Sequence, residues 1–272
     1  MMKIISPERL KRFFKLMISL ILGFLILSLS IVILYRFIPV PYTPLMLIKS
    51  ASAIFNEGPV SISKKWVPIE QIARPMQNAV VKAEDAKFYI HNGFDFEAIE
   101  KAMKYNKTHK KQKGASTISQ QTAKNVFLWP ARSWLRKGME VYFTVMIEFF
   151  WSKKRILEVY LNVIELGPGV YGVEAASQKY FHKKARNLNT SEAALMASVL
   201  PNPIKFKINK PSAYILRRQR KIMGRNNIVI PKVETEAVKT QETNDFFDIK
   251  FDTDDEADSD GAESNNPAPA ND

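Results

Sequence analysis

The strongest hydrophobic pattern in the chain is an uncharged run near its beginning. Residues 16–35 contain no charged side chain, and about 20 apolar residues are enough for a helix to cross the hydrocarbon core of a bilayer. A buried core helix of this length would rarely lack a polar face. The run continues into Arg36, Phe37 and Pro39 without the small-residue cleavage site of a signal peptide. We therefore expect a retained transmembrane helix at residues 16–37.

Five basic residues before this run predict its orientation. They are Lys3, Arg9, Lys11, Arg12 and Lys15. An excess of basic residues marks the cytoplasmic side of a membrane span. Residues 1–15 are therefore expected in the cytoplasm, and the chain after the span is expected on the other side of the membrane.

Prolines and then helical spacing follow the predicted span. Pro39, Pro41 and Pro44 cannot donate the backbone hydrogen bonds of a continuing helix, which predicts an extended juxtamembrane linker at residues 38–59. Alternating strand patterns are rare after the linker, and one short strand is expected at residues 62–67. The remaining periodicity is helical.

Two segments carry the clearest helical signals. Apolar residues spaced along 156–164 share one helix face, and the Gly-Pro-Gly sequence at 167–169 is expected to stop that helix. In the segment 189–200, Asn189 can cap the first turn while Glu192 reaches back, which is a variant of the capping box. These signals predict a mainly α-helical protein.

Charge divides the chain into a basic part and an acidic end. Of 40 Lys and Arg and 27 Asp and Glu, one base and 11 acids follow residue 240, which leaves 39 bases against 16 acids before it. The acidic end has little to bury, so a disordered acidic tail is expected at residues 229–272. The basic part favours a phosphate-bearing partner or lipid head groups, and a location outside the cytoplasm argues against nucleic acid. The absence of cysteine excludes disulfides and thiolate metal sites.

The window AEDAKFYIHNGFD, residues 83–95, concentrates titratable side chains among aromatic rings. Glu84, Asp85, His91 and Asp95 follow no standard zinc spacing, and a hydrogen bond within a turn is enough to explain Asp85 and His91. Glu84 remains unexplained by structure alone. The nearby rings are Phe88, Tyr89, Phe94 and Phe96. Partial desolvation by these rings would raise the pKa of the Glu84 carboxyl and make it a candidate general base.

The window KGASTISQQTAKN, residues 113–125, offers many neutral donors and acceptors, as the recognition of a sugar requires. Gly114 and Ala115 allow a ligand to approach closely, and hydroxyl and amide side chains follow them. The structural alternative is a polar helix start that Ser116 caps. We expect both interpretations to hold.

A basic run with a second carboxylate comes next. Arg132, Arg136 and Lys137 precede Glu140, and such cations bind phosphate or pyrophosphate, arginine through a planar bidentate fork. A solvated or membrane-facing surface is the simpler interpretation of a basic run by itself. Two carboxylates near a glycosidic centre, with cations for a pyrophosphate leaving group, suit transfer of a sugar.

Five segments in order along residues 80–203 resemble the motifs of the peptidoglycan glycosyltransferases, glycosyltransferase family 51, lysozyme-like enzymes that polymerise lipid II. The segments are EDAKFYIHNGFD, GASTISQQTAKN, RKGME, KKRILEVYLNVIELG and SEAALMASVLPNP. Residues 167–181 further resemble the monofunctional biosynthetic members. Ala115, Ser119 and Thr122 depart from the family pattern, which affects the expected shape of the loop rather than the chemistry.

The resemblance implies a role for each candidate residue. Glu84 would take the proton from the acceptor sugar's 4-hydroxyl, and Glu140 would assist as the second carboxylate. The implied substrate-binding residues are Asp85, Ser116, Thr117, Gln120, Gln121, Lys124, Asn125, Arg132, Arg136 and Lys137. Lys124 and Arg132 would hold the donor pyrophosphate. The resemblance implies no metal ligand in the protein and no required cofactor, while Mg²⁺ or Mn²⁺ can bridge a diphosphate.

The resemblance also implies an architecture and a location. A lysozyme-like helical catalytic domain at residues 60–228, with a small membrane-proximal jaw subdomain, would lie on the periplasmic side of a bacterial inner membrane behind one span. Expected partners are lipid II, the nascent glycan chain, the membrane through the span and a basic surface, and cell-wall synthesis or division proteins. The alternatives are a lysozyme-like glycan hydrolase, against which the cations at 124–137 argue, and a non-catalytic membrane scaffold, against which Glu84 and Glu140 argue.

Overall fold

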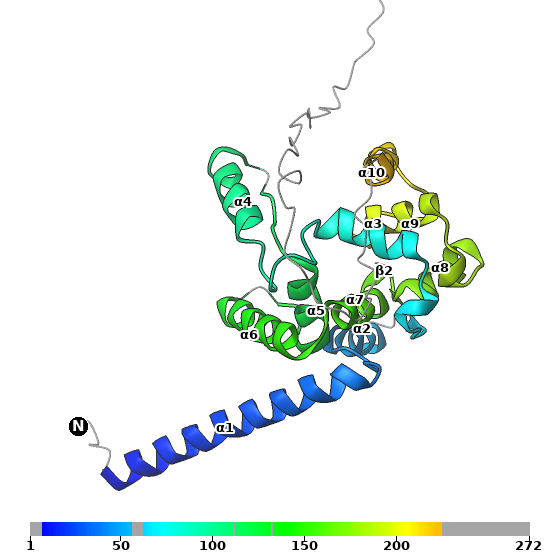
Figure 1. Cartoon of the computed structure of the whole chain (residues 1–272). Helices are drawn as coiled ribbons and strands as arrows, with labels where there is room; N and C mark the ends of the chain where they lie inside the picture. Colours follow the sequence, from blue (N-terminus) through cyan, green and yellow to red (C-terminus); the bar gives the residue numbers. More distant parts are fainter. Residues whose placement is uncertain (1–6, 56–61, 111, 132, 225–272) are drawn as a thin grey trace, which may run out of the picture. The chain divides into compact units, whose positions relative to one another are not determined.

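The computed structural model describes residues 7–55, 62–110, 112–131 and 133–224. The predicted tail at 229–272 and the predicted site residue Arg132 lie outside the described residues. The elements are α1 Pro7–Phe37, α2 Pro44–Phe55, β1 Ser63–Lys64, the 3-10 helix η1 Ile69–Gln71, α3 Arg74–Glu84, α4 Phe96–Thr108, α5 Ile118–Phe127, α6 Trp134–Phe150, α7 Lys153–Val163, β2 Glu165–Gly167, β3 Val170–Tyr171, α8 Val173–Phe181, the 3-10 helix η2 Ala185–Asn187, α9 Thr190–Ser198 and α10 Ala213–Gly224 (Figure 1). The prediction of a mainly helical protein is confirmed.

α1 contains the predicted transmembrane segment. Within the described residues it is the one helix that is long and apolar enough to cross a membrane. It begins at Pro7, earlier than the predicted span, and ends at Phe37, as predicted. Leu20, Ile26 and Leu27 are examples of its exposed apolar side chains. Contact of these side chains with the hydrocarbon core of a bilayer is favourable, whereas their contact with water is unfavourable.

Residues 44–55 form α2, so the prediction of an extended linker there is wrong. Pro44 is the first residue of this helix, and the first amides of a helix have no acceptor inside it, so a missing N–H costs nothing at that position. α2 packs against α5, and Lys49 forms an ion pair with Glu165 of β2. The segment after the span is therefore part of the packed structure.

The end of α1 is bound to α6 and α7 through its own carbonyl groups. Trp151 Nε1 donates to Val32 O at 2.8 Å, and Arg155 Nη2 donates to Tyr35 O at 2.8 Å and also to Ile38 O. Tyr35 is among the last four residues of α1, whose carbonyls lack partners within the helix, and here Arg155 supplies the donor. We call these contacts of Trp151 and Arg155 the α1 clamp.

The predicted short strand is confirmed as β1, within a three-stranded sheet of order β1-β3-β2. β1 pairs in parallel with β3, and β2 pairs with β3 in the antiparallel sense. Asn162 of α7 joins the sheet region to the helices, since its side chain accepts from Val67 N and donates to Val67 O, both at 2.9 Å.

The core follows the helical faces that the sequence predicts. α7 buries Ile156, Leu157 and Leu161 completely, and it packs against α5, while α9 packs against α3 and α10. The capping box of Asn189 and Glu192 at the start of α9 is confirmed. α7 ends at Val163, before the glycines that were expected to stop it, because the chain turns there into β2.

Candidate active site

Glu84 is the last residue of α3, where three helices meet. α3 packs against α9 and buries Met76 and Val81, which leaves the Glu84 side chain 12% exposed at the helix end. Gln121 Nε2 of α5 donates to Glu84 Oε2 at 3.0 Å, and Arg218 Nη2 of α10 lies 3.4 Å from Glu84 Oε1. Each carboxylate oxygen therefore faces a donor from a different helix.

A buried tyrosine sets the orientation of Gln121. Tyr160 Oη of α7 donates to Gln121 Oε1 at 3.0 Å, and burial holds the pKa of this tyrosine well above its ordinary value, so the hydroxyl keeps its proton. An amide whose oxygen accepts from Tyr160 must turn its NH₂ group the other way. That direction is toward Glu84.

Burial is the largest influence on the pKa of Glu84, and it raises the pKa above the ordinary value of a glutamate. The hydrogen bond from Gln121 and the charges of Arg218 and Lys124 act in the opposite direction. The expected direction is confirmed, but Phe96 is 75% exposed and therefore contributes little to the desolvation. A carboxylate with a raised pKa is a better proton acceptor near neutral pH.

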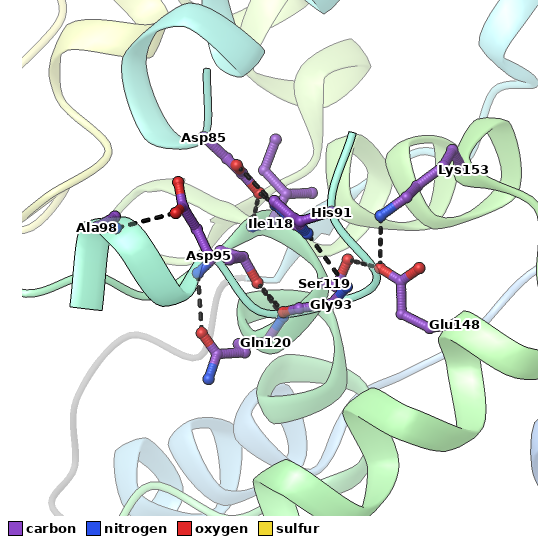
Figure 2. Close-up of polar contacts among 11 residues, drawn as sticks. Asp85, His91, Gly93, Asp95, Ala98, Ile118, Ser119, Gln120, Glu148 and Lys153 are labelled. Atoms are coloured by element: carbon purple, nitrogen blue, oxygen red, sulfur yellow. Dashed lines mark hydrogen bonds and ion pairs between the residues drawn. The ribbon is translucent and has the colours of Figure 1, made fainter. Parts of the chain in front are cut away.

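Asp85, the residue after Glu84, acts with His91 to hold the beginning of α5 (Figure 2). His91 Nε2 lies 2.9 Å from Asp85 Oδ1, Ile118 N donates to Asp85 Oδ2 at 2.9 Å, and Gly93 N donates to His91 Nδ1 at 3.1 Å. Because Nδ1 accepts, Nε2 carries the proton and donates to Asp85. The expected hydrogen bond between Asp85 and His91 is confirmed. A contact of Asp85 with substrate stays a prediction.

Thr117 and Gln120 form a capping box at the start of α5. Thr117 Oγ1 accepts from Gln120 N at 3.2 Å, and Gln120 Oε1 accepts from Thr117 N at 3.0 Å. The N-cap of α5 is therefore Thr117, and the prediction that Ser116 caps this helix is wrong. The N-cap is the residue directly before the first helical residue, which is Ile118, and Ser116 lies one residue earlier. Ser116 is exposed and stays available to a ligand.

A further group of contacts ties α5 to α6 and α7 (Figure 2). Ser119 Oγ donates to Glu148 Oε1, which also accepts from Lys153 Nζ at 2.8 Å. Gly93 lies against the same part of α6, where an added Cβ would come within 2.9 Å of Thr144 Cγ2. Its φ of 90° also lies in the region that favours glycine. These contacts fix the spacing between the helices that carry the candidate residues.

The second carboxylate lies in the first turns of α6 among cations. Glu140 Oε2 accepts from Arg136 Nη1 at 2.8 Å, and Glu140 Oε1 pairs with Lys137. Ser133 caps this helix by accepting from Arg136 N. Glu140 is buried, whereas Lys137 is partly exposed. The carboxylate therefore orients two cations toward an adjoining pocket.

That pocket has a volume of about 140 Å³ and joins α5 to α6. Its lining residues are Ser116, Gln120, Gln121, Lys124, Arg136, Lys137 and Glu140. All of them belong to the set that the resemblance implied. Three cations and several neutral donors face one volume, which suits a diphosphate next to a sugar.

A larger pocket of about 440 Å³ adjoins the first one through Lys124 and Arg136. The remaining lining residues are Leu45, Asn125, Leu128, Trp129, Pro130 and Ala131. Apart from Asn125, these side chains are apolar, and Leu45 comes from α2, close to the end of the span. The predicted binding residue Asn125 therefore lies in this apolar pocket, and it does not line the polar pocket.

Lys124 lies between the two carboxylates. Its side chain is exposed to the water of the pockets but is surrounded by protein on its other sides, and this partial desolvation is the largest cause that lowers its pKa. The charges of Glu140 and Glu84 act in the opposite direction, while Arg136 and Lys137 lower the pKa further. The charge of Lys124 thus reaches both carboxylates.

Comparison with known proteins identifies the family of this chain. The family model described as Transglycosylase matches residues 52–227 of this chain. The chain belongs to the transglycosylase family. The resemblance stated from the five motifs is confirmed, and the matched range includes every candidate residue of the site.

Curated relatives of this transglycosylase match most of its length. A biosynthetic peptidoglycan transglycosylase of Bdellovibrio bacteriovorus is 60% identical over 242 residues, which cover 89% of this chain and 95% of the relative. One of Bacteroides thetaiotaomicron is 48% identical over 87% of this chain and 96% of the relative. One of Pasteurella multocida is 55% identical over 73% of this chain and 81% of the relative.

Sequence reasoning missed several residues that shape the site of this transglycosylase. Tyr160 lies on the apolar helix face predicted at residues 156–164, which gives no indication that its hydroxyl donates to Gln121. Arg218 lies 134 residues from Glu84 along the chain, and nothing in the sequence pattern connects the two. Lys153 opens the fourth motif, but nothing in the sequence pattern connects it to Glu148 of the preceding helix.

Proposed function

We propose that this chain is a peptidoglycan transglycosylase that polymerises lipid II into β-1,4-linked glycan strands. The observation that carries the proposal is the polar pocket between α5 and α6, where three cations and Glu140 lie beside Gln121, the residue that contacts Glu84. The family membership and the names of the relatives support the same reaction. The pocket suits the diphosphate and the sugar of a lipid-linked donor.

In the proposed reaction Glu84 takes the proton from the 4-hydroxyl of the acceptor N-acetylglucosamine. The hydroxyl oxygen forms a bond with the anomeric carbon of the lipid-linked growing chain, and the bond from that carbon to the diphosphate oxygen breaks. Undecaprenyl pyrophosphate leaves with the electron pair, and attack from the opposite side inverts the anomeric carbon. A diphosphate is a weakly basic leaving group, so it needs stabilisation of its negative charge by cations more than it needs a proton.

Lys124, Arg136 and Lys137 stabilise the negative charge that develops on the diphosphate. Glu140 holds the last two through separate oxygens, so that they are oriented before the substrate arrives. Lys124 is shared by both pockets and reaches the charge of both carboxylates. Lys124 is therefore suited to stabilise the charge on the diphosphate oxygen whose bond to the anomeric carbon breaks.

The donor set of this pocket does not fit a divalent ion held by the protein. Both oxygens of Glu140 already accept from cations, and no cluster of three His, Asp or Glu side chains gathers within the described parts of the chain. A Mg²⁺ or Mn²⁺ ion would have to be bound by the diphosphate itself. No step of the proposed reaction passes through a metal.

The apolar pocket and α6 support an active site that opens toward the bilayer. The larger pocket combines Leu45 and Trp129 with the cation Lys124, as the first apolar units of a polyprenyl diphosphate require. α6 contacts α1 through the hydrogen bond between Tyr142 and Ser28 and exposes Phe149. The proposed location is the outer face of a bacterial inner membrane, with the basic N-terminal segment in the cytoplasm.

Incubation of the purified full chain with lipid II in detergent, followed by separation of the products, tests this function. We expect long glycan strands with β-1,4 linkages and release of undecaprenyl pyrophosphate. A glycan hydrolase would instead shorten preformed strands and leave lipid II intact. A non-catalytic scaffold would change neither substrate, and either result would contradict the proposal.

A further inference from the structure

Arg218 reaches the candidate active site from α10, a helix that lies after the five motifs in the chain. α10 packs against α9 and α3, and it buries Ile215 and Ile222. Gln219 Nε2 donates to Ser191 O at 2.8 Å, which fixes the rotation of the helix about its axis. With this rotation, Arg218 points to the end of α3.

The contact between Arg218 and Glu84 is direct but incomplete. Arg218 Nη2 lies 3.4 Å from Glu84 Oε1, and the Arg218 side chain is 28% exposed. Arg218 Nε is buried and has no hydrogen-bond partner among the described residues. An arginine used only to strengthen the fold would be expected to make the full set of hydrogen bonds that its planar group allows. Here the Arg218 guanidinium contacts a single carboxylate oxygen, Glu84 Oε1.

We propose that Arg218 is a positioning residue for the transfer reaction, whose guanidinium holds Glu84 Oε1 while Gln121 holds Oε2, so that the base is ionised and correctly oriented. The inference rests on the proposed role of Glu84 as the general base. A buried carboxylate needs such a partner, because burial by itself favours the neutral acid, which cannot accept the proton.

Lys124 cannot replace Arg218 in this role. Lys124 lines both pockets and interacts with Glu140 as well as Glu84, so a bound diphosphate draws on its charge. Arg218 lines neither pocket. Its charge is therefore kept for Glu84 at every stage of the reaction, and arginine stays protonated at any working pH.

The groups around Glu84 determine the sign of the expected pH effect. The charges of Arg218 and Lys124 lower the pKa of Glu84, and the charge of Asp85 raises it, as burial does. Tyr160 also faces this group and stays neutral. Loss of the Arg218 charge would raise the pKa of Glu84 further. Because the base must be ionised, activity would then disappear at a higher pH than in the wild type.

The test is the pH dependence of kcat/KM for lipid II polymerisation by the full chain in detergent. Arg218→Gln should shift the acidic limb of the profile upward by about one pH unit, within the range expected when one nearby opposite charge is lost. Activity should return toward the wild-type level above that limb. Arg218→Lys, which keeps a charge, should place the limb nearer to that of the wild type. Arg220→Gln, an exposed arginine on the same helix, is the charge-matched control and should leave the limb unchanged.

Two results would overturn the role of Arg218: an acidic limb at the wild-type pH in Arg218→Gln, or equal limbs in Arg218→Gln and Arg218→Lys. An activity loss that is the same at every pH would indicate only structural support and would also count against it. If Arg218→Gln unfolds, Arg218→Met, which keeps the aliphatic part of the side chain, gives the same measurement. Glu84→Gln is measured alongside, because full activity of that variant would contradict the proposed base itself rather than the role of Arg218.

Discussion

Lys124 lines both pockets, as Arg136 does, so loss of the Lys124 charge should weaken substrate binding as well as lower the rate. Lys124→Ala removes a charge-assisted contact to the diphosphate, and we expect binding of lipid II or of a phosphoglycolipid inhibitor to weaken by about 1.5 to 3 kcal/mol. Titration in one detergent measures the change. Lys205→Ala removes the same charge from an exposed position outside both pockets and should bind as the wild type does. Equal affinities of the two variants would contradict the assignment of Lys124.

At the residue scale, the sequence predicted which residues carry chemistry better than it predicted which residues contact one another. Glu84 and the cations of the polar pocket were found because their residue types are unusual for their surroundings and occur in recognisable motifs. The contacts of Tyr160 with Gln121 and of Arg218 with Glu84 were not predicted, because a hydrogen bond between distant segments leaves no local pattern. Thr117 took the capping position expected of Ser116, since a shift of one residue decides which side chain reaches the first turn.

At the element scale, the α1 clamp makes the membrane helix part of the packed structure. Arg155 contacts the carbonyls of Tyr35 and Ile38 and also pairs with Glu158. Arg155→Gln should leave these groups without partners and lower the free energy of unfolding in detergent by about 1 to 3 kcal/mol. Thermal unfolding measures the loss.

Lys154→Gln is the matched control for the clamp, because Lys154 is the preceding residue and its ion pair with Glu70 is exposed. Such surface pairs contribute about 0 to 1 kcal/mol. Similar midpoints of unfolding for Arg155→Gln and Lys154→Gln would show that the clamp contributes little to stability.

The elements with strong periodicity were predictable, and those set by contacts were not. α7 and α9 followed from the apolar spacing and the capping box, because both signals are local. α2 was missed because Pro44 was read as a helix breaker, whereas proline is favourable as the first residue of a helix. The predicted end of α7 was too late. The helix ends at Val163 because the chain enters β2 two residues later, before it reaches the first glycine.

At the scale of the whole molecule, we predict that polymerisation does not depend on a divalent metal ion. Both oxygens of Glu140 already accept from Arg136 and Lys137, and in the proposed reaction the cations of the polar pocket would neutralise the diphosphate. Polymerisation of lipid II by the wild type should therefore proceed at the same rate after chelation with EDTA as before. A loss of activity that added Mg²⁺ or Mn²⁺ restores would contradict this prediction.

The central claim, that Glu84 is the base of a glycosyl transfer, is tested most directly by the initial rate of lipid II polymerisation. Glu84→Gln and the wild type are compared in the same vesicles, with lipid II binding measured on both. The glutamine keeps the size of the side chain but cannot accept the proton, so the rate should fall by about a hundredfold or more. Binding should persist, because the cations of the polar pocket are unchanged. Polymerisation by Glu84→Gln at nearly the wild-type rate would contradict the account.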